Sequence, residues 1–141
     1  MNEVDLLHHI YQTAEMGVDG IDAVRGKVEN DAFGALLDEQ REEYRRLKSS
    51  AALILQDHGV EPKGIGTMAK LSSEAMSTMK TLTDHSTAKL AEMMIQGSTM
   101  GVTKSMRTLR DCHVEDEGVQ NLGEQLLKVE QRNIQQLKRF L

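Results

Sequence analysis

The chain has 141 residues, the size of one ordinary domain, and we expect residues 1–141 to form a single domain with its own hydrophobic core. Its formal net charge is −5, and its basic residues are scattered or lie among acidic ones, which argues against nucleic-acid binding. The single Cys112, the acidic Glu3 and Asp5 at the start, and the lack of an apolar run near the roughly 20 residues that span a bilayer indicate a cytoplasmic protein that binds no membrane.

A first helix is predicted over residues 3–28. Its inward positions recur at alternating spacings of three and four, as in a bundle seam: Leu7, Ile10, Ala14, Gly17, Ile21, Val24 and Val28. Asn2 is the predicted N-cap, with Asp5 reaching back to complete a capping box. Asn30 or Asp31 caps the next helix after a short turn, so the first two helices should be antiparallel neighbours.

A second helix is predicted over residues 32–58, and it stops at Gly59, a residue suited to the left-handed conformation after a helix end. Its inward stripe, with Glu43 at the edge, consists of Phe33, Leu37, Gln40, Tyr44, Leu47, Ala51 and Ile54. Residues 60–67 contain the only proline and are expected to form a loop. A short amphipathic helix with a methionine-rich face should follow over residues 68–82.

A third long helix should begin near Asp84 or Ser86 and end near Cys112. We expect its inward positions to be Leu90, Met93, Met94, Gly97, Gly101 and Met106, with the two glycines allowing close helix packing. Acidic residues 115–117 favour the start of a fourth helix, which should extend to Leu141. Its inward apolar residues surround Glu130 and Asn133, and they are Val119, Leu122, Leu126, Leu137 and Phe140.

A polar pair occurs twice on these inward faces. Gln40 and Glu43 lie among leucines in the second helix, and Glu130 and Asn133 lie among leucines in the fourth. The first and third long helices show a fainter similarity, in which Gly20 and Ile21 align with Gly101 and Val102. We infer two helical hairpins, related by duplication and joined by a long connector, although the pattern does not indicate whether that connector crosses the length of the bundle.

This arrangement resembles the ferritin-like superfamily, and most closely its short bacterial four-helix members. The resemblance covers nearly the whole chain as a pattern. In the iron-carboxylate members the second and fourth helices each carry Glu-x-x-His, and the first and third each supply one more Glu. Here the matching positions are Gln40 with Glu43 and Glu130 with Asn133, while the other two helices offer Gly17, Gly97 and Ser98. The resemblance therefore implies an all-α, ferritin-like four-helix bundle with a short extra helix in its connector and an incomplete di-iron ligand set.

The polar residues allow more than one interpretation. A core polar layer of Gln40, Glu43, Glu130 and Asn133, with Lys104 as the nearest counter-charge, could fix the register of the helices. The same residues could instead hold a small ligand, or a metal bound by Glu43 and Glu130. The structural interpretation is the one that we favour.

Other residues could also carry chemistry. His9 and His58 should lie at one end of the bundle, joined there by Cys112 and His113 if the connector crosses the bundle, or by His85 if it does not. Such a set could bind zinc or copper, although its spacing is not that of a zinc motif, and solvated terminal histidines are the simpler explanation. Cys112 next to His113 has no third group to make it a catalytic thiol, and the many methionines fit core or subunit packing.

No phosphate-binding loop, dinucleotide fingerprint, nucleophile elbow or paired-cysteine motif occurs in the sequence. We therefore assign no catalytic residue and no cofactor. The function that we expect is that of a non-catalytic bundle whose ancestral di-metal site has been lost, and which acts as a homo-oligomer or by binding a protein partner. The alternative is a metal-binding or weakly redox-active bundle that uses Glu43 and Glu130.

Overall fold

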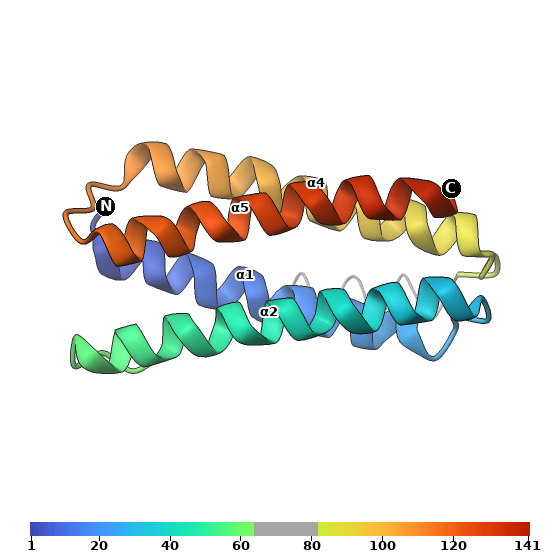
Figure 1. Cartoon of the computed structure of the whole chain (residues 1–141), viewed down its shortest axis with the longest axis horizontal. Helices are drawn as coiled ribbons and strands as arrows, with labels where there is room; N and C mark the ends of the chain where they lie inside the picture. Colours follow the sequence, from blue (N-terminus) through green and yellow to red (C-terminus); the bar gives the residue numbers. More distant parts are fainter. Residues whose placement is uncertain (64–81) are drawn as a thin grey trace.

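The computed structural model describes residues 1–63 and 82–141, and in these residues it contains helices and no strands. Four long helices form an all-α bundle, as the sequence predicts (Figure 1). They are α1 (Glu3–Arg25), α2 (Asp31–Asp57), α4 (Thr87–Asp111) and α5 (Glu117–Leu137), and α5 continues into the short 3-10 helix η1 (Lys138–Phe140).

Side-chain caps fix where the helices begin. Asn2 and Asp5 form the predicted capping box at the start of α1, and the Asn30 side chain accepts a hydrogen bond from the backbone N–H of Phe33. The first helix ends three residues earlier than predicted, because the chain turns at Gly26. Gly59 follows α2 with φ of +71°, the left-handed conformation that the sequence predicts there.

The helices pair as two antiparallel hairpins, α1 with α2 and α4 with α5 (Figure 1). The end of α2 and the start of α4 lie at opposite ends of the bundle, so these two helices run in the same direction. The connector between the hairpins therefore joins opposite ends of the bundle, which answers a question that the sequence left open. The helix predicted over residues 68–82 lies outside the described residues, apart from Leu82, which is not helical.

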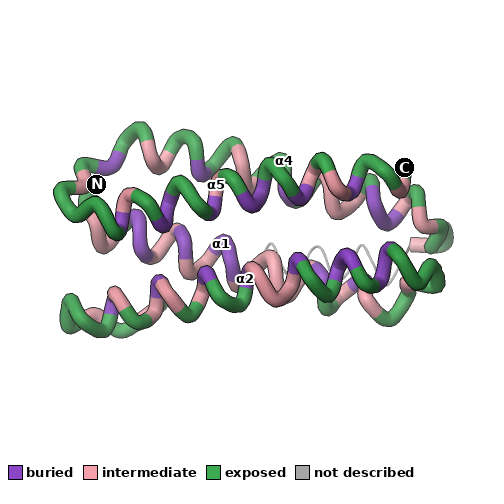
Figure 2. The backbone as a smooth tube through the Cα atoms, viewed as in Figure 1, coloured by how far each residue is buried: buried purple, intermediate pink, exposed green. Residues whose placement is uncertain are grey.

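All four helices contain buried residues (Figure 2), and the buried apolar ones form one core cluster. The predicted seam of α1 is confirmed, because its five aliphatic and alanine positions from Leu7 to Val24 are buried. In the described chain no helix is both long enough and apolar enough to cross a membrane.

Three of the four buried residues of the α4 helix are small. Its most deeply buried residues are Leu90, Ala91, Ser98 and Ser105. The prediction that Gly97 and Met106 face inward is wrong, since Gly97 is exposed and contacts nothing where a Cβ would lie, and Met106 is 55 % exposed. Because Ser105 faces the core, Met106 points about 100° away from it and toward solvent.

Candidate functional site

The two hairpins are joined at their centre by a hydrogen bond between Tyr44 on α2 and Glu130 on α5. The Tyr44 hydroxyl donates to Oε2 of Glu130 over 2.9 Å. Both side chains are buried, Tyr44 to 4 % and Glu130 to 2 % exposure. Because α2 belongs to one hairpin and α5 to the other, this bond is a polar contact within the interface between the hairpins.

A glycine on the neighbouring helix makes room for each of these two side chains. A Cβ atom at Gly17 on α1 would lie 2.6 Å from carbons of the Tyr44 ring, and a Cβ atom at Gly101 on α4 would overlap the Glu130 carboxylate. Each hairpin therefore places one bulky polar side chain against one glycine. The glycine that corresponds to Gly101 in this arrangement is Gly17, and not Gly20 as the sequence similarity suggested.

Burial controls the protonation of this pair. It raises the pKa of Glu130 to about 7, an effect that the hydrogen bond from Tyr44 partly opposes. Burial, followed by the neighbouring carboxylate, also raises the pKa of Tyr44. Among residues 1–63 and 82–141, no Lys, Arg or His forms an ion pair with Glu130. Near neutral pH Glu130 therefore gains or loses a proton, and no described cation balances the charge of its ionised form.

Amide side chains complete the buried layer. Asn133 is 0 % exposed and lies beside the Tyr44 hydroxyl, but neither its Nδ2 nor its Oδ1 has a well-aligned hydrogen bond to another described residue. Gln40 is 2 % exposed, and its Nε2 donates to Oε1 of Gln136 over 3.3 Å. The structure thus places three of the predicted polar residues, Gln40, Glu130 and Asn133, in the interior.

The two charged residues predicted for this layer lie elsewhere. Glu43 is at the surface of the α2–α5 interface, where it forms an ion pair with Arg132, and its side chain is 31 % exposed. Lys104 is exposed, so the prediction that it is the counter-charge of Glu130 is wrong. Successive helical residues point about 100° apart, so when Tyr44 faces the core Glu43 is turned toward the edge. Tyr44, which the apolar spacing already places on the inward stripe of α2, makes the contact with α5 that we expected of Glu43.

The predicted set of terminal histidines does not assemble. Nε2 of His9 lies 2.9 Å from the Ser105 hydroxyl on α4, and burial, assisted by the charge of Lys104, lowers the pKa of His9 to about 4. His58 instead contacts the Ile54 carbonyl oxygen through Nδ1 at 2.8 Å, and its Nε2 is 3.6 Å from Glu3. His9 thus links α1 to α4, whereas His58 lies at the exposed end of α2.

Cys112 and His113 arrive at the end of the bundle that holds His58, as predicted for a connector that crosses the bundle. The backbone N–H of His113 donates to the carbonyl oxygen of Met1, so Cys112 and His113 reach the end of the bundle where α1 begins, while His85 precedes α4 at the other end. Burial raises the pKa of the Cys112 thiol, which disfavours the thiolate needed for catalysis or metal binding. In the part of the chain that the structure describes, no three His, Cys, Asp or Glu side chains are grouped closely enough to hold a metal ion.

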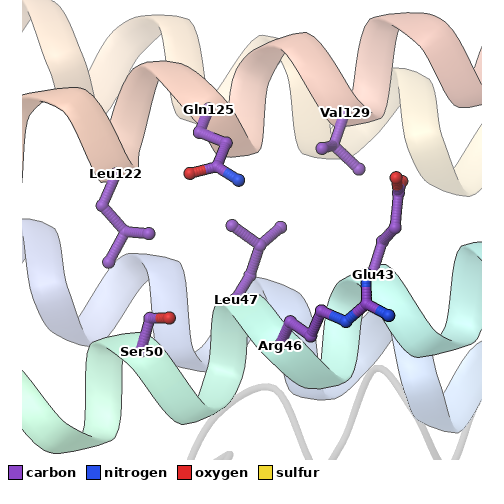
Figure 3. A pocket seen from close by; sticks show the side chains of 7 residues that line it. All are labelled: Glu43, Arg46, Leu47, Ser50, Leu122, Gln125 and Val129. Carbon is purple, nitrogen blue, oxygen red and sulfur yellow. The ribbon is translucent and has the colours of Figure 1, made fainter.

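A shallow groove of about 100 Å³ lies between α2 and α5, outside the buried layer (Figure 3). Its floor is apolar, formed by Leu47, Leu122 and Val129. Its rim is polar and consists of Glu43, Arg46, Ser50 and Gln125. The groove offers a place for an apolar side chain rather than a site for catalysis, because it has no nucleophile paired with a base.

Comparison of the chain with family models, with curated proteins and with solved structures found no match in any of the three.

Proposed function

We propose that this chain is a non-catalytic, ferritin-like four-helix bundle that acts by associating with itself or with a partner protein. The topology supports this proposal. Two antiparallel hairpins whose connector joins opposite ends of the bundle, with α2 and α4 parallel, form the one-crossover arrangement typical of ferritin-like folds.

The donor atoms at the centre do not fit a ferritin-type di-metal site. That site needs several inward carboxylates, and here Glu130 is the only carboxylate in the described interior. Glu43 is turned toward Arg132, and the other two long helices face the layer with Gly17, Gly101 and the buried Ser98, none of which is a carboxylate. These observations support the loss of an ancestral site, and they disfavour the alternative of a metal-binding bundle based on Glu43 and Glu130.

The observation that carries the proposal is that the centre of the bundle is closed. Tyr44 and Glu130 bond to each other and fill the space that Gly17 and Gly101 leave, so a substrate has no room to enter between them. Large apolar side chains are exposed only on outer surfaces in the described chain, at the long-helix positions Leu53, Met100 and Met106, which are 63 %, 62 % and 55 % exposed, and at the two chain ends. These side chains are the large apolar groups that the described helices offer to a partner.

Two measurements test the proposal. Light scattering at micromolar concentration should show a species larger than the monomer, and a strictly monomeric chain would remove self-association. Elemental analysis of protein from metal-supplemented culture should show no stoichiometric metal. Metal that is present in the wild type and lost in both Glu43→Ala and Glu130→Ala would overturn the non-catalytic assignment.

A further inference from the structure

Four side chains form a line along one side of α2, next to the α2–α5 groove. Arg46, Ser50, Leu53 and Asp57 follow one another at spacings of four, three and four residues, which places them on one side of the helix over ~16 Å. Leu53 is 63 % exposed, and the side chain of Arg46 is 71 % exposed. We call these four residues the α2 stripe.

The α2 stripe borders the groove between α2 and α5. Arg46 and Ser50 belong both to the stripe and to the groove, and in Figure 3 Leu47 and Ser50 point from α2 toward Leu122 and Gln125 of α5. With a volume of about 100 Å³, the groove is of the scale of one aliphatic side chain. Leu53 stands one turn beyond Ser50 on the same helix, so an exposed apolar side chain and a groove able to receive one lie side by side.

The order of charges along the α2 stripe is complementary to itself. If a second copy of α2 packs antiparallel across a two-fold axis midway between Ser50 and Leu53, each Arg46 lies opposite Asp57 of the other copy. The same operation places each Leu53 opposite Ser50, at the edge of the groove of the other copy. Arg46 has one ion pair among the described residues, a long 3.6 Å contact with Glu42, and Asp57 has none among them. Within the described chain, neither charge is neutralised by a close ion pair.

We infer that the α2 stripe is a homodimer interface, in which Leu53 of each copy enters the α2–α5 groove of the other copy and Arg46 pairs with Asp57 across the two-fold axis. This inference rests on the proposed function and specifies the surface and the partner. Two-fold pairing of this kind closes on itself and gives a dimer rather than a filament. One pair of helices buries a small area, so the dimer should form at micromolar concentration or above.

Sedimentation equilibrium of the full chain tests the interface through charge reversal. Arg46→Asp and Asp57→Arg should each weaken the dimer, because each places like charges opposite each other twice. The double variant Arg46→Asp/Asp57→Arg should restore wild-type association, since it exchanges the two ends of the same pair. If both single variants dimerise weakly and the double variant dimerises no better than they do, the inference is overturned.

Leu53→Ser should raise the dimer dissociation constant at least about tenfold, because two buried leucines are lost for each dimer. Met100→Ser is the matched control, as Met100 is equally exposed but lies on α4, away from the groove, and it should leave association unchanged. All five substituted chains should keep wild-type helix content, since the altered side chains are on the outside.

A dimer that is abolished by Met100→Ser and unaffected by Leu53→Ser would refute the α2 interface while leaving self-association intact. A wild-type chain that stays monomeric at every concentration would instead remove self-association and the interface together.

Discussion

Glu130 accepts its one described hydrogen bond from a residue of the other hairpin, the Tyr44 hydroxyl 2.9 Å away, and no described cation pairs with it. A buried carboxylate in such a position is tolerated mainly in its neutral form. Packing between the hairpins is therefore coupled to one proton, and the strength of that coupling can be measured.

The first prediction concerns this proton. The pKa of Glu130 is about 7 in the folded chain and near 4.5 when it is unfolded, so the unfolded state binds fewer protons between these values. Stability should therefore fall as pH rises from 4.5 to 7, by about 3 kcal/mol from this group. Glu130→Gln should remove that dependence in urea titrations at pH 5 and pH 8. An unchanged difference between the two pH values in the variant would contradict the prediction.

The second prediction concerns the packing of Tyr44 against Gly17. Gly17→Ala places a methyl group 2.6 Å from ring carbons and should destabilise the fold by about 1–3 kcal/mol, because the ring cannot move without losing its bond to Glu130. Gly20→Ala is the matched control on the same helix, where a Cβ meets nothing within 4 Å. It should be stabilising by about 0.5–1 kcal/mol through helix propensity. Thermal unfolding of both variants gives the comparison, and equal shifts would argue against the packing.

The third prediction concerns the amide of Asn133. Because neither amide atom of this fully buried side chain has a well-aligned hydrogen bond among the described residues, Asn133→Leu should increase the free energy of unfolding by about 1–3 kcal/mol. Chemical denaturation measures this directly. A loss of stability in the leucine variant would show that the amide is bonded within the folded bundle.

The fourth prediction concerns His9, whose effect on stability changes with pH in the direction opposite to that of Glu130. Its pKa is about 4 in the folded chain and 6.5 when it is unfolded, so the unfolded state binds more protons between these values. Stability should therefore be lost as pH falls from 6.5 to 4, by about 3 kcal/mol or less for this partly exposed ring. His9→Gln keeps a partner for Ser105 and should remove this loss. Since His9 and Glu130 act in opposite directions over overlapping ranges, each variant must be compared with the wild type at every pH.

The four helices could be predicted from the sequence because their apolar periodicity and caps are local signals, as at Asn2, Asp5 and Gly59. The centre of the site was only partly predictable. Glu130 and Asn133 lie in the interior as predicted, but Glu43 and Lys104 do not. The apolar spacing does not fix the rotation of a helix about its axis to within 100°, which is the angle between successive residues. The bond from Tyr44 depends on how one hairpin packs on the other, and no local pattern encodes that.

The pairing of neighbours along the chain has a consequence for the order of assembly. Contacts between α1 and α2, and between α4 and α5, are local in sequence, whereas those between the pairs join residues far apart. Such short-range contacts form fastest, so during synthesis the first pair can close while the rest of the chain is still being made. The α1–α2 hairpin would then already hold Tyr44 packed against Gly17. The second hairpin would dock on this surface last, when Glu130 bonds to Tyr44.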